Sequence, residues 1–183
     1  MSAFEYFFGF FGLILGLSVT EVVTGFSQAI QRRKHVAVGV LTPLMALFVL
    51  VDLASFWNNL WQWMQTVSIS LGLLLTGIAV AAIYYLAASL LVPRDLEAWP
   101  SLDEYFFAHK RWISLGVLTA NLIAGFGFTA FVSSPQEYWA AVFSMGTFLK
   151  TGYFSAVLLA LAFCKGRPVS IALILLALAN YLF

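Results

Sequence analysis

Two acidic residues and one basic residue lie inside long apolar stretches of the chain, where each could take part in chemistry. Glu21, Asp52 and Lys150 are each flanked on both sides by mostly hydrophobic residues. An isolated charge at the centre of a bilayer costs about 2.5–3.5 kcal/mol, so such charges face protein, water or a counter-charge. Two acids and one base leave one negative charge uncompensated, which a bound proton or a cation would neutralise. Proton relays and cation sites in helical membrane proteins are built from such groups.

Helical spacing places uncharged polar residues beside each of these charges. At about 100° per residue, residues three or four positions apart share one face of a helix. By this rule, each of the three charged residues has polar residues beside it on the same helix face. Asn121 is a further polar residue in another apolar stretch. The candidate residues of an ion pathway are therefore Glu21, Thr24, Gln28, Asp52, Ser55, Asn59, Asn121, Thr147 and Lys150.

The expected depth of these residues predicts which charges pair. With about 1.5 Å of rise per residue, Lys150 and Asn121 fall near the midplane of the membrane. Glu21 falls about 6 Å to one side and Asp52 about 5 Å to the other. We expect the Lys150 ammonium to pair with Asp52, which leaves Glu21 to be protonated or to meet a cation. A network that only fixes the register of the helices is the alternative interpretation.

Long apolar helices must position these residues. The chain has 183 residues, of which 62% are hydrophobic and 9% charged, whereas soluble domains have about 25% charged residues. We therefore predict an all-α polytopic membrane protein, a single domain embedded in the lipid bilayer, with no nucleic-acid partner. A membrane-spanning helix needs about 20 apolar residues. This length predicts a six-helix bundle with helices at residues 6–30, 36–61, 67–92, 112–133, 138–164 and 169–183.

Basic residues predict the orientation of this bundle. Lys and Arg concentrate in the first, third and fifth connections, and the second and fourth connections contain none. Because basic loops stay in the cytoplasm, both termini are expected to face outward. In the third connection, Ser101 and Glu104 have the spacing of a capping box. We expect a cytoplasmic interfacial helix there, at about residues 102–111.

Small residues in the first helix predict close packing. Gly9, Gly12 and Gly16 fall on a face away from Glu21, and small residues let helices approach closely. We expect this helix to be the central, two-sided element of the bundle, with the third and sixth helices around the outside. The glycine face is also a candidate contact with a second copy or with a partner membrane protein.

The two halves of the chain show a weak internal similarity. The segment that starts at Glu21 aligns with the segment that starts at Asn121, and Asp52 then falls near Lys150. With three helices in each half, the second half would be inverted, as in many transporters. A 3+3 inverted repeat is one interpretation of this pattern, and chance similarity between apolar segments is the other.

The residue pattern gives no indication of a cofactor, a metal or catalytic residues. Neither of the two histidines, His35 and His109, lies within a predicted span, which argues against a haem held by two histidines. Neither forms a ligand-pair spacing with Cys164, and scattered surface residues are the simpler interpretation. Hydrolase, metalloprotease and dinucleotide-binding motifs do not occur. The sequence therefore does not favour an enzyme.

Two parts of the chain resemble a widespread family of small multi-pass bacterial membrane proteins. The first comprises Phe4-Glu5-Tyr6, then Ile14-Leu15-Gly16-Leu17-Ser18-Val19-Thr20 with Gly25, and the second is Tyr105-Phe106-Phe107-Ala108-His109-Lys110-Arg111-Trp112. The resemblance implies a multi-pass architecture and a bacterial inner membrane. It implies no activity and no functional residues.

Two classes of function follow from these patterns. The first is a small transporter or channel-like protein that moves protons or a small cation through the polar interior. The second is a structural or interaction subunit whose charges only hold helices together. A transporter should contain a cavity that reaches the buried charges, whereas a structural subunit should have a dry core.

Overall fold

The computed structural model of the chain describes residues 3–64 and 70–181. Regular structure in these residues is helical, and one isolated backbone bridge joins Ala37 to Ser101. The elements are α1 (Ala3–Gln31), α2 (Leu41–Met64), α3 (Leu71–Ser89), α4 (Leu102–Leu122), the π-helix η1 (Ile123–Phe128), α5 (Thr129–Val132), α6 (Pro135–Val142), α7 (Met145–Phe163) and α8 (Arg167–Ala179).

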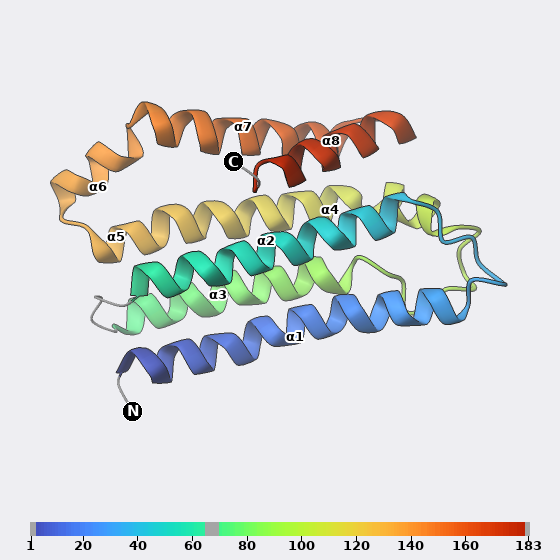
Figure 1. Cartoon of the computed structure of the whole chain (residues 1–183), viewed down its shortest axis with the longest axis horizontal. Coiled ribbons are helices and arrows are strands. Elements are labelled where there is room, and N and C mark those ends of the chain that lie inside the picture. The colour runs from blue at the N-terminus through green and yellow to red at the C-terminus, as the bar shows by residue number, and fades with distance from the viewer. Residues whose placement is uncertain (1–2, 65–69, 182–183) are drawn as a thin grey trace.

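By length and composition, five helical segments of the described chain can cross a membrane. They lie roughly antiparallel, side by side, in a layered bundle (Figure 1). This confirms the predicted all-α fold with several long apolar helices, and the length and composition of these helices indicate a multi-pass membrane protein. The segments are Phe7–Gln31, Leu41–Gln62, Leu71–Ser89, Leu102–Phe131 and Met145–Phe163.

The sixth expected helix is shorter than a membrane span. The helix α8 has 13 residues and rises about 20 Å, whereas the hydrocarbon core of a bilayer is about 30 Å thick. It starts at the end of the bundle where α7 stops and reaches about halfway along it (Figure 1). Residues 67–69 and 182–183 of the expected helices lie outside the described part of the chain.

The interfacial helix expected at residues 102–111 is instead the beginning of α4. Ser101 is the N-cap, and its hydroxyl accepts a hydrogen bond from the backbone N–H of Glu104 at 3.2 Å. The predicted capping residue is thus confirmed. No proline or glycine follows until Gly116, so nothing breaks the helix at the expected boundary near residue 111.

The fifth expected helix, residues 138–164, is broken in two. Ser144 caps α7 by accepting a hydrogen bond from the backbone N–H of Thr147 at 3.1 Å, and α6 has already ended at Val142. A serine side chain that bonds to the backbone favours a helix start over a helix interior. Lys150 therefore lies in the second turn of α7, near one end of the bundle, and its expected position at the midplane is wrong.

The first helix lies at the edge of the bundle. It packs mainly on α3 and less on α2, whereas α3 contacts α1, α4 and η1. The sequence-based expectation, with a central first helix and a peripheral third helix, is therefore wrong. Gly12 does face a neighbour, the indole ring of Trp57, but Gly9 and Gly16 have open space beside them.

Close contacts between α1 and α3 depend on glycine. A side chain at Gly77 of α3 would collide with the ring of Phe11, which is fully buried. A side chain at Gly25 of α1 would meet Val92 at 2.9 Å. Lipid is as apolar as the side chains it replaces, so close packing of this kind is a main source of stability inside a membrane.

The basic connections gather at one end of the bundle, which we call the basic end (Figure 1). Arg32 in the first connection pairs with Glu97 in the third at 3.1 Å. Asp103 binds Arg167 at 3.3 Å and accepts a hydrogen bond from the backbone N–H of Leu41, the first residue of α2, at 3.2 Å. Asp103 thus ties the starts of α2, α4 and α8 together.

Lys110 is part of the core near the basic end. It is 4% exposed, and its ammonium donates a hydrogen bond to the backbone carbonyl of Cys164 at 2.5 Å. It also lies 3.1 Å from the Cys164 sulfur and 5.1 Å from the centre of the Phe107 ring. This lysine, expected on the cytoplasmic surface, therefore holds α4 against the C-terminal end of α7.

The neighbours of each helix differ between the two halves of the chain. In the expected inverted repeat, α1, α2 and α3 correspond to α4, α7 and α8. The extensive contact between α1 and α3 would then have a counterpart between α4 and α8. In the described chain, α4 packs on α3 and α7 instead, and its contact with α8 is at most marginal. The packing thus does not reproduce the alignment of the two halves.

Candidate functional site

A buried acid, Asp52, is the centre of a hydrogen-bond network among four parts of the chain. Asp52 is only 1% exposed to solvent. The Tyr84 hydroxyl donates to Oδ2 at 2.9 Å, and the Asn121 amide lies 3.1 Å from both carboxylate oxygens. The Tyr181 hydroxyl donates to Oδ1. The network therefore joins α2, α3, α4 and the segment after α8.

The groups around Asp52 are uncharged. Asn121 also donates to the Val117 carbonyl at 3.0 Å, which fixes the side-chain amide in place. Among the residues that the structure describes, no basic side chain forms an ion pair with Asp52. A carboxylate has about four lone-pair sites, and the three donor groups make four contacts with it, two at each oxygen.

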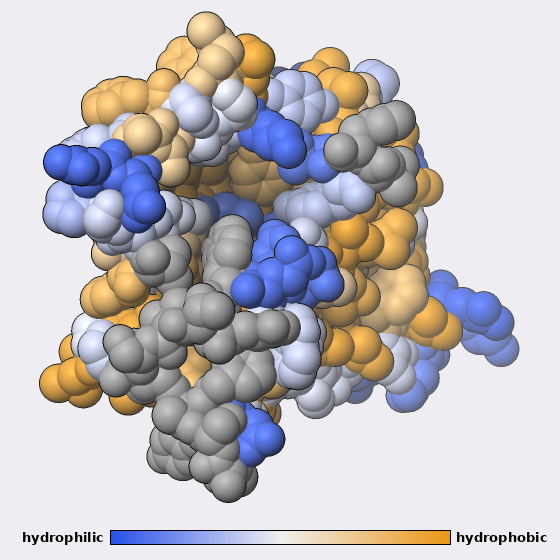
Figure 2. All heavy atoms as spheres, turned by 60° about the vertical axis from the view of Figure 1, so that its left-hand side comes forward, coloured by the Kyte–Doolittle hydropathy of each residue, from blue (hydrophilic) through white to orange (hydrophobic). Residues whose placement is uncertain are grey.

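A cavity of about 980 Å³ reaches Asp52. Its walls come from α2, the end of α4, η1, α5, α6 and α7, together with the end of α8 and the residues after it. Figure 2 brings the end opposite the basic end forward and shows a hollow with hydrophilic residues at its rim and in its depth. Of the nine residues predicted to form an ion pathway, this cavity contains Asp52, Ser55, Asn59, Asn121, Thr147 and Lys150.

The short helix α8 accounts for the position of the cavity. It packs against α2 and α7 and ends at Ala179, so that Asn180 and Tyr181 line the cavity next to Asp52. The remaining lining residues of α2 and α7 belong to the halves of these helices that lie farther from the basic end. The cavity thus occupies the space between α2 and α7 that a full-length α8 would fill.

A π-helical segment forms part of the wall. Ala124, Gly125 and Phe126 of η1 line the cavity. The Thr129 hydroxyl donates to the Gly125 carbonyl at 2.5 Å, which satisfies a backbone acceptor in this irregular stretch. Short π-helical segments within α-helices are rare and are frequent at functional sites.

The structure brings Lys150 to the cavity but does not pair it with Asp52. Lys150 is exposed and lines the cavity from α7, and within the described chain it has no acidic partner. The predicted direct ion pair between these residues is therefore wrong. The prediction fails because the helix is broken before α7, and this break moves Lys150 away from the depth of Asp52.

Glu21 lies in a different place. Together with Thr24 and Gln28 it lines a second cavity, of about 330 Å³, between α1 and the C-terminal end of α3. Ser89 and Arg94 also line this cavity. The structure thus separates the nine candidate residues into two groups, six around Asp52 and three around Glu21.

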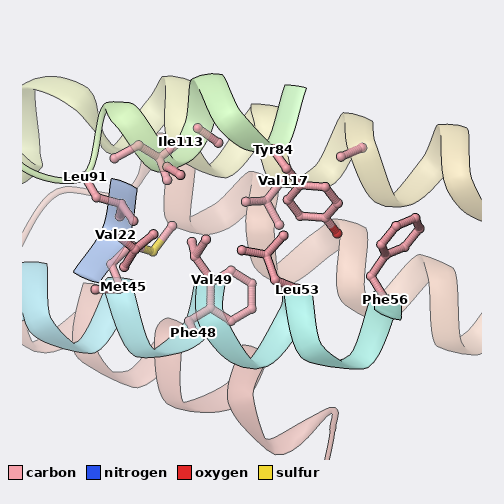
Figure 3. Close-up of a cluster of buried hydrophobic side chains, with 14 of the residues drawn as sticks. Val22, Met45, Phe48, Val49, Leu53, Phe56, Tyr84, Leu91, Ile113 and Val117 are labelled. Carbon is pink, nitrogen blue, oxygen red and sulfur yellow. The ribbon is translucent and has the colours of Figure 1, made fainter. Parts of the chain in front are cut away.

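An apolar core lies toward the basic end from Asp52. Met45, Val49 and Leu53 follow one another along α2 and point toward side chains of α1, α3 and α4 (Figure 3). All three are buried, as are the residues that they face, Val22, Leu91, Ile113 and Val117. The cavity around Asp52 therefore ends against a packed apolar layer.

Sequence reasoning missed two members of the site, Tyr84 and Tyr181. Tyr84 is fully buried in a helix expected at the periphery, and Tyr181 follows a helix expected to run past this depth. A hydroxyl group within an apolar helix such as α3 must find a hydrogen-bond partner. This requirement could have identified Tyr84 as a candidate from the sequence alone.

The described residues contain no group of three or more histidine, cysteine, aspartate or glutamate side chains that could hold a metal ion. The fold and the site define a class, a multi-pass helical membrane protein with a buried carboxylate at the end of a cavity. Comparison with known proteins finds no family model that matches the chain, and no curated protein or solved structure that is similar to it. Its function is therefore argued from the geometry alone.

Proposed function

We propose that the protein is a small carrier or channel-like protein of the bacterial inner membrane that takes a proton or a small cation to Asp52. The observation that carries this proposal is the position of the Asp52 carboxylate beside a large cavity with polar and apolar lining residues, where it is held only by neutral groups. Buried carboxylates of this kind in membrane bundles bind protons or cations. The basic end then faces the cytoplasm, because Lys and Arg stay on that side.

The second cavity supports a route toward the other side. Glu21 lines it at the cytoplasmic end of α1 and α3 in this orientation, together with Thr24 and Gln28. Val49 and Leu53 are buried and line neither cavity, and in this proposal they form the barrier between the two. Transport would require a rearrangement of this barrier, as in carriers whose two sides open alternately.

Ion flux into liposomes tests the proposal. Purified protein is reconstituted into liposomes that contain a pH-sensitive dye, and a potassium gradient with valinomycin sets the membrane potential. Parallel assays with sodium- and potassium-sensitive dyes cover the small cations. We expect flux in the wild-type protein and at least a tenfold loss in Asp52→Asn.

The control is Asp95→Asn, which changes an exposed carboxylate in the connection between α3 and α4. Its flux should equal that of the wild-type protein. Absence of proton, sodium and potassium flux in the wild type would contradict the proposal, as would equal flux in Asp52→Asn.

A structural or interaction subunit is the second candidate function. The observation that favours it is the network itself, because Asp52, Tyr84, Asn121 and Tyr181 join separate helices. Polar groups hold helices together in membranes, at about 0.6–1.7 kcal/mol for each interaction. This alternative predicts no ion flux in any variant and a loss of folded protein when Asp52 is changed to Ala.

A further inference from the structure

Two opposite charges line the cavity from different helices. Asp52 belongs to α2 and Lys150 to α7, and both line the same cavity. They do not form an ion pair, and the Lys150 ammonium has no acidic partner anywhere in residues 3–64 and 70–181. A single cation bound at Asp52 would leave the lysine without a counter-charge.

The cavity is much larger than an ion. A water molecule occupies about 30 Å³ in the liquid, so about 980 Å³ corresponds to roughly thirty waters. Pockets for small organic ligands have volumes of about 300–1,000 Å³. The space therefore fits an organic solute.

The lining is amphipathic. Phe56 and Phe154 are buried and line the cavity from α2 and α7, and Phe126 contributes from η1. Ser55 and Asn59 add a hydroxyl and an amide group to the lining. A ligand that fits this lining has charged groups at one part and an apolar body at another.

We infer that the cavity binds an amphipathic zwitterion, with its ammonium group at Asp52, its carboxylate or phosphate group at Lys150 and its apolar body among the phenylalanine rings. This inference rests on the proposed function and names the substrate class of the same site. The ammonium group of the ligand takes the place of the small cation. At the Asp52 carboxylate, the ligand ammonium replaces the contact that the Asn121 amide shares between the two oxygens, and the Tyr84 and Tyr181 donors stay in place.

Two sources supply this chemistry. A free amino acid with an aromatic side chain carries an ammonium, a carboxylate and an apolar body. A lipid with a phosphoethanolamine headgroup carries an ammonium, a phosphate and an acyl chain. Both present the two charges a few atoms apart, and separate arms of the experiment distinguish them.

A charge series on the wild-type protein tests the inference. Calorimetric titration in detergent micelles compares phenylalanine with its cationic analogue phenylalaninamide and its anionic analogue N-acetylphenylalanine. The lipid arm compares lysophosphatidylethanolamine with lysophosphatidylglycerol. We expect one zwitterion, free or lipid, to bind at least tenfold more tightly than the singly charged members of its series.

Two variants assign the charges. Lys150→Met should reduce the affinity for the zwitterion to that of the cationic analogue, and Lys165→Met, which changes an exposed lysine outside both cavities, should leave it unchanged. Asp52→Asn should remove the advantage of the zwitterion over the anionic analogue. If Asp52→Asn does not fold, the wild-type series and the Lys150→Met variant still test the inference.

The outcomes separate this inference from the proposed function. Equal binding of all members of both series, or no binding, would overturn the inference, whether or not Asp52-dependent ion flux is found. Tight binding of a zwitterion without ion flux would support the inference and contradict the proton or cation pathway.

Discussion

The Asp52 carboxylate is surrounded by hydroxyl and amide donors, and each of them can be removed separately. Tyr84, in the C-terminal part of α3, donates to Asp52 at 2.9 Å and is fully buried. Loss of one donor leaves a less well satisfied acidic group at membrane depth. Substitutions of single residues can therefore distinguish the two candidate functions of the network.

Tyr84→Phe should destabilise the fold by about 1 kcal/mol, the typical value of a side-chain hydrogen bond between membrane helices. The matched control is Tyr85→Phe, since the Tyr85 hydroxyl forms no hydrogen bond with the described residues. Unfolding by a denaturing detergent, followed by circular dichroism, measures the difference. Equal stability of the two variants would show that the hydroxyl bond to Asp52 contributes nothing to the fold.

Glu21→Gln should leave stability nearly unchanged, because Glu21 is only half-buried and forms no ion pair within the described chain. The same variant should lose ion flux in liposomes, since the amide cannot release or bind a proton. Glu104→Gln, an exposed position at the basic end, serves as the control. Full flux in Glu21→Gln would remove the second cavity from the pathway.

The sequence was sufficient to find the acid but not all of its partners. Asp52 and Asn121 stand out because a charge and an amide within apolar runs need partners. Tyrosine is also common at membrane surfaces, so Tyr84 and Tyr181 do not indicate their depth by type alone. Their roles depend on where α3 packs and where α8 stops, which the sequence pattern does not give.

At the scale of the elements, the glycines of α1 differ in ways that helical spacing could not reveal. Gly12 faces Trp57, whose ring also packs on Phe8 with 4.0 Å between the ring centres. Gly16 lies one turn away with open space beside it. The same small-residue pattern therefore contains one packed position and one open position.

Gly12→Leu should destabilise the fold by about 1–3 kcal/mol, the usual cost of overpacking, because the new side chain must displace the indole ring of Trp57. Gly16→Leu should be tolerated and serves as the matched control. The midpoint of thermal unfolding in detergent measures both. Similar losses in the two variants would mean that a second protein chain covers the Gly16 face.

Helix boundaries limited the sequence-based prediction of the elements. The existence of α1, α2, α3 and α7 follows from their long apolar runs. The break at Phe143 and Ser144 was missed because Tyr138 to Cys164 is continuously apolar enough to be read as one helix. Serine is a preferred N-cap residue, but an average of hydropathy over the whole stretch does not register a single serine.

At the scale of the whole molecule, the positions of the basic residues define two ends. Arg32 of the first connection pairs with Glu97 of the third, and Arg167 at the start of α8 pairs with Asp103 at the start of α4, so the three basic connections meet. The sequence predicted this grouping because every basic residue except Lys150 falls in one of three predicted connections. The lateral order of the helices could not be predicted, since lipid-facing and protein-facing surfaces are both apolar.

Cysteine labelling tests the orientation. In a Cys164→Ser background, Gln136→Cys in α6 should react with a membrane-impermeant maleimide on intact cells. Lys34→Cys at the basic end should react only after the membrane is opened. Both positions are exposed, so accessibility within the protein does not limit the reaction. The reverse pattern would place the basic end outside and exchange the roles of the two cavities.

The short helix α8 also has an electrical consequence. Water in the cavity above its end would conduct the outer potential down to Asp52, so the membrane voltage would fall mainly across the apolar layer around Val49 and Leu53. One elementary charge that crosses the full potential changes in energy by about 2.3 kcal/mol per 100 mV. Entry of a cation from the outside should therefore depend weakly on voltage, and its passage beyond Asp52 should depend strongly on it.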